Sequence, residues 1–185
     1  MSIPLLKPLP LFLVLARSSL GWVAVVASSK GVRWITLQAT RVGAKVAACE
    51  RFGDNLEEIS TQAPDKNAHP LALKMINWIN VVVRRVENPA HYEPCALDIE
   101  GTAFQRSVWA VLQKIPAGSV LRYADVVRQV GRPRAARAVG NACGANPVAF
   151  IIPCHRVVAS DGGLGGFGLG VAIKMALLAR EGIRF

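Results

Sequence analysis

Residues 151–158 read IIPCHRVV and bring a thiol, an imidazole and a guanidinium together. A cysteine in apolar surroundings is usually an inert core group. A neighbouring imidazole or cation changes this, because it favours the thiolate, which is the nucleophilic form. Cys154 is therefore a candidate nucleophile, because His155 and Arg156 follow it directly.

The segment that follows, SDGGLGGFGLG (160–170), has six glycines in eleven residues. Such a loop lets the backbone approach a ligand closely, although a plain flexible connector is the alternative reading. The spacing matches no phosphate-binding fingerprint, so no nucleotide cofactor is predicted. An apolar helix is expected at 171–182, with Glu181 close to its end.

The four cysteines (Cys49, Cys95, Cys143 and Cys154) include no C-x-x-C pair, and the chain has only three histidines. A metal site is therefore not predicted. A disulfide framework is also unexpected at this length, which favours a reducing, intracellular and cytoplasmic setting. The first apolar run is too short for a secretion signal and no segment is long enough to span a membrane, so no membrane partner is expected.

The formal net charge of +10 is concentrated in the second half of the chain. Residues 1–100 hold 11 basic and 9 acidic residues, whereas residues 101–185 hold 11 basic and only 3 acidic ones. An excess of this kind attracts polyanions, and it favours a nucleic-acid partner.

Residues 1–90 predict an α/β domain whose first part is an antiparallel meander. Short β-branched and aromatic runs alternate with turns, and two longer periodic runs indicate helices. The expected strands are 11–16, 22–28 and 32–38, the helices are 43–52 and 71–85, and 53–70 and 87–94 are expected to be a polar loop and a linker.

Residues 91–185 predict a second, mainly α domain. Thr102 and Gln105 form a capping box before a helix that extends to residue 115. Helices are expected at 123–131 and 135–146, joined by the turn GRPR, and this arrangement is typical of a helix-turn-helix. The run VAFII (148–152) is expected to be a buried strand.

The second helix of this pair is nearly free of bulky side chains, which allows close approach to a partner. Ala135 and Ala136 lie at its start, and tight packing inside the protein is the alternative explanation. The surrounding basic residues favour DNA, and a helix this smooth can enter the minor groove. The basic residues of this region are Arg122, Arg128, Arg132, Arg134 and Arg137.

The motif IPCHRV, preceded by RAVGNACGANP and by the helix-turn-helix, resembles the 6-O-methylguanine-DNA methyltransferase family. The resemblance is close over 98–185 and looser over 11–90, which is similar to the family's ribonuclease-H-like N-terminal domain. It implies a monomer that repairs double-stranded DNA without a cofactor. The methyl group of 6-O-methylguanine, and also of 4-O-methylthymine, would pass irreversibly to Cys154, one lesion per molecule, after the base is flipped out of the duplex.

The resemblance also implies roles for residues that contact DNA. Arg137 would insert into the vacated base stack, and Ala135 and Ala136 would line the minor groove. Tyr123 would rotate the neighbouring phosphate and hydrogen-bond the flipped base near N3. Backbone groups of Cys154 and Val157 would recognise the edge of the base.

For the chemistry, the resemblance implies that His155 takes the thiol proton through a water and that Glu181 stabilises the resulting charge. Asn146 would brace the turn that holds the cysteine. In the pocket, Phe167 stands where many relatives have tyrosine, Gly168 lacks a hydroxyl, and Leu169 is larger than the usual glycine. Leu169 therefore predicts a preference for methyl over benzyl adducts, and Cys143 is expected to be a bystander thiol.

Three alternatives belong to other classes. A helix-turn-helix regulator would bind DNA without chemistry and would tolerate loss of Cys154. A cysteine hydrolase would turn over repeatedly and would not need the arginine cluster. A lesion-binding relative without transfer activity is disfavoured by the intact cysteine.

Overall fold

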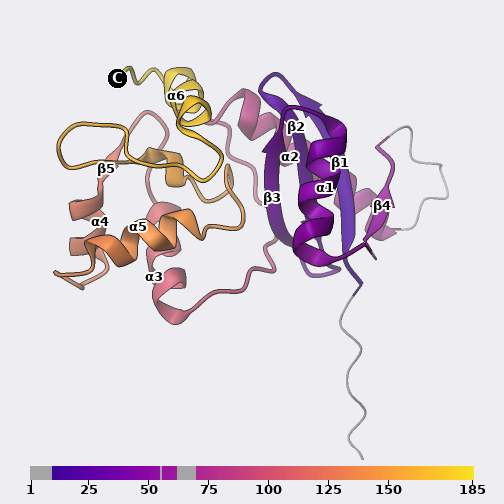
Figure 1. Cartoon of the computed structure of the whole chain (residues 1–185), viewed down its shortest axis with the longest axis horizontal. Helices are drawn as coiled ribbons and strands as arrows, with labels where there is room; N and C mark the ends of the chain where they lie inside the picture. Colours follow the sequence, from indigo (N-terminus) through magenta and orange to yellow (C-terminus); the bar gives the residue numbers. More distant parts are fainter. Residues whose placement is uncertain (1–9, 55, 62–69) are drawn as a thin grey trace, which may run out of the picture.

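The computed structural model describes residues 10–54, 56–61 and 70–185 (Figure 1). The predicted meander is confirmed: β1 (Phe12–Ser18), β2 (Gly21–Ala27) and β3 (Val32–Gln38) pair antiparallel in sequence. All three strands are rich in β-branched and aromatic residues, which suit a pleated, buried surface.

A fourth strand corrects the expectation that 53–70 is only a loop. β4 (Glu57–Ile59) pairs parallel with β1, so that the sheet has the order β3-β2-β1-β4. The strand is only three residues long and contains two glutamates, so the sequence has no alternating apolar pattern that would predict it. Residue 55 and residues 62–69 of the same expected loop lie outside the described residues.

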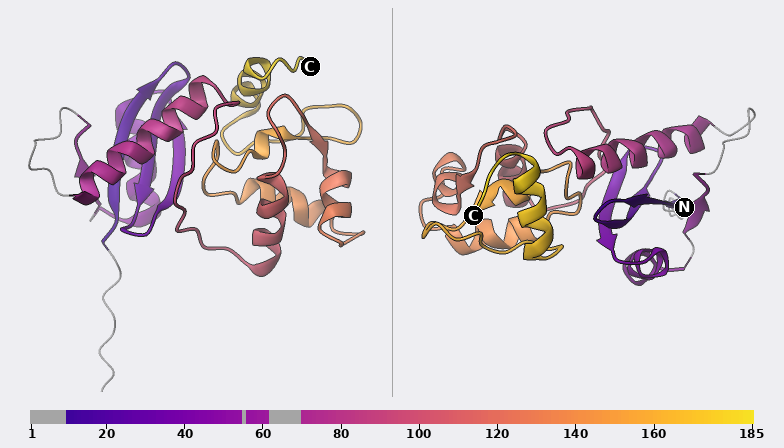
Figure 2. Two further views of the ribbon diagram at one scale, coloured as in Figure 1. Left: turned by 180° about the vertical axis from the view of Figure 1, so that it is seen from behind. Right: turned by 90° about the horizontal axis from the view of Figure 1, so that it is seen from above.

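Helices cover both faces of this sheet (Figure 2). α1 (Arg41–Phe52) begins two residues before the predicted helix, because Thr40 Oγ1 accepts a hydrogen bond from the Gly43 amide at 3.0 Å. α2 (Pro70–Glu87) packs on the opposite face and has proline at its first position, where a missing N–H costs nothing. Two covered faces explain why the strands are apolar on both sides.

The connection from α2 to the second half runs along the edge of β3. The Val32 amide donates to Ala96 O and the Asp98 amide donates to Val32 O, both at 2.9 Å. The predicted linker 87–94 therefore starts as the last residue of α2 and continues without helix or strand, and the residues that follow it, 96–98, are fixed to β3. This connection holds the helical half against β3.

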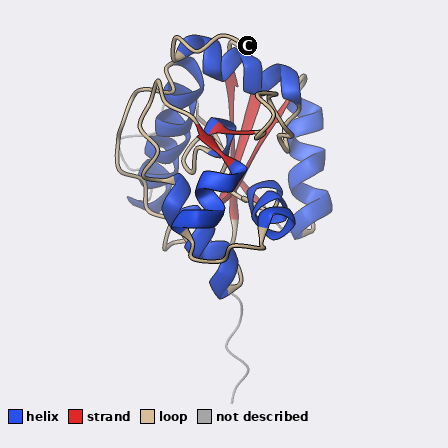
Figure 3. Ribbon diagram, turned by 90° about the vertical axis from the view of Figure 1, so that its left-hand side faces the viewer, coloured by secondary structure: helices blue, strands red, loops and turns tan. Residues whose placement is uncertain are grey.

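The second half is mainly helical, and its helices surround a short two-stranded ladder (Figure 3). Thr102 and Gln105 form the predicted capping box at the start of the first helix. β5 and β6, which pair in parallel, were not expected. The elements are α3 (Ala103–Leu112), β5 (Leu121–Arg122), α4 (Tyr123–Gln129), α5 (Ala136–Gly144), the 3₁₀ turn η1 (Cys154–Arg156), β6 (Val157–Val158) and α6 (Val171–Arg180).

The predicted strand at 148–152 is wrong, because this segment forms tight turns. The amides of Ile151 and Ile152 both donate to Val148 O, at 3.2 and 3.0 Å, and Phe150 has a φ of 73°. A segment buried on every side is apolar throughout whatever its conformation, so composition alone could not distinguish a turn from a strand. The reactive motif is therefore delivered by a folded-back turn.

One apolar core joins the two halves of the mixed α/β fold. It runs from the α2 face of the sheet through α3 and α5 to Leu177 of α6. A smaller cluster fills the space between the sheet and α1. Among the described residues, no helix has the length and apolar character needed to cross a membrane.

Candidate active site

The turn that carries Cys154 is organised by the side chain of Asn146. Its amide nitrogen donates to Ile152 O at 2.8 Å and to Cys154 Sγ at 3.1 Å, and its carbonyl oxygen accepts from the Val148 amide at 3.1 Å. One side chain therefore fixes both ends of the turn. It also places a hydrogen-bond donor on the sulfur, which favours the thiolate.

His155 is buried at 1% exposure and faces a carboxylate. Its Nε2 lies 3.0 Å from Glu181 Oε1, whereas its buried Nδ1 has no hydrogen-bond partner among the described residues. Burial lowers the pKa of His155 despite the hydrogen bond to Glu181. The imidazole is therefore neutral at rest, with a proton on Nε2 and a lone pair on Nδ1 that can accept one.

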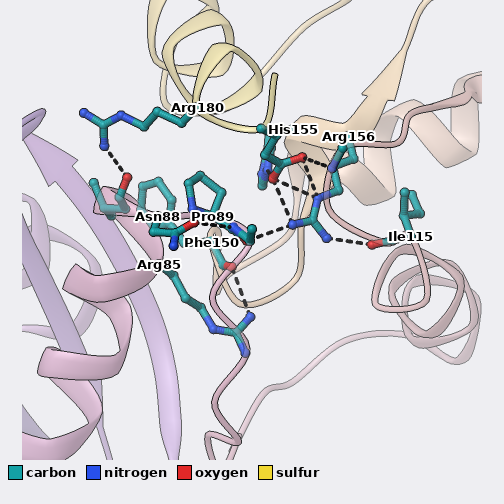
Figure 4. Close-up of polar contacts among 12 residues, drawn as sticks. Arg85, Asn88, Pro89, Ile115, Phe150, His155, Arg156 and Arg180 are labelled. Atoms are coloured by element: carbon teal, nitrogen blue, oxygen red, sulfur yellow. Dashed lines mark hydrogen bonds and ion pairs between the residues drawn. The ribbon is translucent and has the colours of Figure 1, made fainter. Parts of the chain in front are cut away.

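Glu181 caps the end of α6 and accepts hydrogen bonds from three residues, two of which, His155 and Arg156, are labelled in Figure 4. Arg156 donates from Nε at 3.0 Å and from Nη2 at 2.8 Å, His155 faces the same oxygen, and the Gly118 amide donates at 3.2 Å. Burial raises the pKa of this carboxyl, but the hydrogen bonds from His155 and Arg156 outweigh it and lower the pKa to about 2. Glu181 is consequently a carboxylate at neutral pH.

Arg156 is itself held on its other side by backbone. Its Nη1 donates to Ile115 O at 2.6 Å and its Nη2 to Pro89 O at 2.9 Å. Arg156 is 8% exposed, so its ion pair with Glu181 is buried, and its guanidinium donates further hydrogen bonds to these two backbone carbonyls. In the sequence, Arg156 was interpreted only as a cation beside the thiol, and its contacts were not predicted because Glu181, Ile115 and Pro89 are distant in sequence.

Cys154 lines two cavities that share a wall. The first has a volume of about 210 Å³ and is bordered by Tyr123 and Gly140. The second, of about 180 Å³, lies at the edge of β3 and is bordered by Trp34 and Leu169. The residues common to both are Cys143, Gly144, Cys154, Phe167 and Gly168.

Cys154 is not held as a thiolate at rest. Burial raises the pKa of its thiol, even though the Asn146 donor and the charge of Lys174 act in the opposite sense. The ionisation expected from the sequence therefore requires transfer of the proton to a base. His155 is the adjacent neutral base, although the structure gives no direct hydrogen bond between the two side chains.

Lys174 is a second functional candidate that sequence analysis missed. Its side chain is fully buried, and its ammonium donates to Val157 O at 2.5 Å, to Leu164 O and to Gly166 O at 3.2 Å. Through the carbonyls of Leu164 and Gly166, Lys174 fixes the glycine-rich loop, and this loop lines the first cavity. The available signal was a single lysine on the apolar face of the predicted helix, where an unpaired charge is costly.

The structure places the predicted DNA-contacting residues on α4, on α5 and in the turn between them. Tyr123 is half-buried and lines the first cavity, and burial raises the pKa of its phenol. Arg128 pairs with Asp125 at 2.5 Å. Ala135 is partly exposed, and the exposed residues of this set are Arg128, Arg132, Arg134, Ala136 and Arg137.

Two predicted residues behave differently from their neighbours. Val157 is fully buried with its carbonyl on Lys174, and it is not among the described residues that line the two cavities. Cys143 does line both cavities, but burial raises the pKa of its thiol to about 12. The site therefore brings together Asn146, Cys154, His155 and Glu181, with Tyr123 and Cys143 at the cavity wall.

Comparison with known proteins matches residues 103–183 to the model of the 6-O-methylguanine DNA methyltransferase DNA-binding domain. A methylated-DNA–protein-cysteine methyltransferase of Mycolicibacterium paratuberculosis is 51% identical over 85 residues, which are 46% of this chain and 52% of that protein. The chain spans about half or less of the length of the first curated relatives it matches.

Two solved structures from Mycobacterium tuberculosis match nearly the whole chain. A single-residue variant of OGT is 30% identical, covers 95% of this chain and 94% of its own, and has a TM-score of 0.67. The structure of OGT in complex with DNA is 29% identical, covers 92% of both chains and has a TM-score of 0.69. With the sequence motif, the fold and the site in agreement, the chain belongs to the 6-O-methylguanine-DNA methyltransferase family.

Proposed function

We propose that the protein repairs DNA by moving the methyl group of 6-O-methylguanine irreversibly onto its own Cys154, as a stoichiometric methylated-DNA–protein-cysteine methyltransferase. The observation that carries this proposal is the position of Cys154. It lines a cavity together with Tyr123, and the residue that follows it, His155, is buried against Glu181. The same chemistry applies to 4-O-methylthymine, which presents a methyl ether at the equivalent edge.

The first step is proton transfer from the thiol to His155. The lone pair on Nδ1 is buried and unpartnered among the described residues, which suits acceptance of a proton through one bridging water. Glu181 then stabilises the imidazolium across the 3.0 Å contact. The Asn146 amide at 3.1 Å stabilises the negative charge that develops on the sulfur.

The second step is displacement at the methyl carbon. The thiolate forms the S–C bond while the bond between the carbon and guanine O6 breaks, and its electron pair stays on guanine. The base takes up a proton from the site, so that the thiol proton is transferred to guanine in net and His155 is neutral again. The product is a thioether, which has no thiol left to ionise, and each molecule therefore acts once.

Tyr123 is suited to hold the base in the cavity. Burial raises the pKa of its phenol, so the hydroxyl stays protonated and can donate to the N3 region of a flipped base. It would also rotate the adjoining phosphate. The cost of extruding the base is a few kcal/mol and must be recovered from contacts of this kind.

We also propose that α4 and α5 act as a helix-turn-helix that enters the minor groove. The exposed Arg132 and Arg134 would neutralise phosphates, Arg137 would occupy the vacated stack, and the small Ala135 and Ala136 would allow close approach. In its support, the related mycobacterial OGT has been crystallised in complex with DNA.

The two halves of the chain would form two domains with different roles. Residues 1–90 would form a ribonuclease-H-like domain, and residues 91–185 would form the DNA-binding and transfer domain of a monomer. The reaction consumes a free thiol, and all four cysteines are free in the structure. This supports a reducing, cytoplasmic location.

The test is mass spectrometry of the protein after reaction with a duplex that contains 6-O-methylguanine. The peptide with Cys154 should gain one methyl group, and repair should stop at one equivalent of lesion. An unmodified peptide would refute transfer, and repair beyond one equivalent would refute the single-use mechanism. A duplex with unmodified guanine is the matched control.

A further inference from the structure

A third cavity lies behind the reactive turn, between the end of α2, the 89–97 segment and the end of α3. Its volume is about 350 Å³. None of the described residues that line it also lines the two cavities at Cys154. The polar residues of its wall include Arg85, His91, Tyr92, Cys95, Lys114 and Arg156.

The wall of this cavity is positively charged. Arg85, Lys114 and Arg156 contribute cations, and no aspartate or glutamate is among the described residues that line it. Arg156 is compensated by Glu181, with an N–O distance of 2.8 Å. Lys114 is exposed and makes no ion pair with any described residue.

Arg85 is a buried cation without a carboxylate partner among the described residues. It is 9% exposed, and its strongest hydrogen bond is to the backbone carbonyl of Glu93 at 2.8 Å. Its Nη1 reaches Phe150 O and Ile151 O at only 3.5 and 3.4 Å (Figure 4), and its buried Nε has no partner in the described part of the chain.

The nearest acid serves a different arginine. The carboxylate of Glu93 pairs with Arg84, which is the exposed neighbour of Arg85 on α2, at 2.6 Å. A guanidinium cannot lose its proton in a protein, so burial leaves Arg85 charged. Glu93 stabilises this charge without forming an ion pair with it, whereas the nearby guanidinium of Arg156 repels it. A buried charge of this kind requires a partner.

We propose that this cavity binds a small oxyanion, a phosphate or a carboxylate, with the Arg85 guanidinium as its main ligand and Lys114 as a second cation. The planar fork of arginine matches either group in a bidentate arrangement. The Arg85 guanidinium lies over the ring of Tyr92, with 5.4 Å between Cζ and the ring centroid, and Tyr92 is 81% exposed. Tyr92 therefore flanks the guanidinium at the solvent side of the site.

The experiment measures thermal unfolding of the full chain in sodium phosphate, in sodium acetate and in sodium chloride of equal ionic strength at pH 7. An anion that binds the folded state raises Tm, by about 3–6 °C when its concentration is ten times Kd. Wild type should show this rise with phosphate or acetate relative to chloride. Arg85→Met should lose it, and the matched control Arg84→Met should keep it.

Phosphate can also bind the exposed arginines of α4 and α5, and the variants separate the two cases. A rise in Tm that Arg85→Met retains in full would assign the anion to that face and overturn the proposal. The absence of any specific rise in wild type, with both phosphate and acetate, would overturn it as well. A rise with only one of the two anions, lost in Arg85→Met, supports the site and identifies the class of ligand.

A second measurement does not depend on the folding of a variant. Cys95 lines the cavity and is partly exposed, so its alkylation by iodoacetamide can be followed by peptide mass spectrometry. Phosphate or acetate should slow modification of Cys95 severalfold relative to chloride and leave Cys49, which lies on α1, unchanged. Equal rates at Cys95 in all three salts would contradict the proposal. Neither result bears on methyl transfer, which uses a different cavity.

Discussion

Cys154 and Cys143 line the same two cavities, but the side chains that surround the two thiols differ. Cys154 on the reactive turn and Cys143 on α5 are 6% and 8% exposed, so burial does not distinguish them. Cys154 receives a hydrogen bond from Asn146 at 3.1 Å and is followed by the His155–Glu181 pair. Cys143 has no such donor or base among the described residues, and burial raises the pKa of its thiol to about 12.

The comparison shows that reactivity here depends on what surrounds a thiol after burial. Burial alone raises the pKa of both sulfurs and makes both inert. At Cys154, Asn146 adds a fixed hydrogen-bond donor and His155 adds a neutral base. The carboxylate of Glu181 can stabilise the positive charge that His155 gains on protonation. At Cys143, no described side chain provides such a donor or base, and the backbone amides of α5 are occupied by hydrogen bonds within the helix.

The largest expected effect comes from exchanging the sulfur at each position. Cys154→Ser should lower the single-turnover rate of methyl transfer by at least about 10³-fold, because a serine hydroxyl at this position is a far weaker nucleophile than a thiolate. Cys143→Ser should remain within about threefold of wild type. The measurement is loss of 6-O-methylguanine from a duplex under excess protein. Substantial transfer by Cys154→Ser, or a comparable loss in Cys143→Ser, would remove the distinction between the two thiols.

The next effect tests the carboxylate behind His155. Glu181→Gln should lower the transfer rate by about 10²- to 10³-fold, since an imidazolium would form without its counter-charge. The substitution also leaves Arg156 buried and unpaired, which costs about 3–5 kcal/mol of stability. The double variant Glu181→Gln, Arg156→Met removes that cost, so its stability should recover while its rate stays low. Recovery of the rate together with stability would mean that Glu181 acts only as a structural partner of Arg156.

Lowering the pH should reduce the stability of the protein through Glu181 and His155, the pair that follows Cys154 and is absent at Cys143. The pKa of Glu181 is about 2 in the folded protein against an ordinary value of 4.5, so the unfolded state binds more protons between these values. The free energy of unfolding should therefore fall as pH drops from about 5 toward 2, and the lowered pKa of His155 acts in the same direction below about 6.5. Denaturant titrations over this range should show a flatter profile for the double variant than for wild type. Parallel profiles would place the acid sensitivity elsewhere.

Sequence analysis anticipated the elements whose patterns are local. The meander at 11–38 alternates apolar runs with turns, and the Thr102–Gln105 capping box is readable within four residues. The turn at 148–152 was mistaken for a strand because a buried segment carries no periodicity. β4 and β5 were missed because strands of two or three residues have too few positions to show a pattern.

The site followed the same division. Cys154, His155 and Glu181 were predicted through the motif and its family resemblance, and in the structure His155 contacts Glu181. The contacts of Arg156 and Lys174 were not predicted, because their partners, the Glu181 carboxylate and several backbone carbonyls, are brought near by folding. Such contacts depend on tertiary placement, and the residue type alone does not specify them.

The smallest effect concerns the second cavity and the size of the alkyl group. Leu169 lines this cavity together with Trp34 of β3 and with Cys154. Leu169→Gly should raise the rate for a benzyl adduct relative to a methyl adduct by about tenfold, since the loss of several apolar atoms opens space beside the reacting carbon. The methyl rate itself should change little. Competition between the two adducts in one duplex pool measures this ratio directly, and similar wild-type rates for both would show that Leu169 does not restrict the substituent.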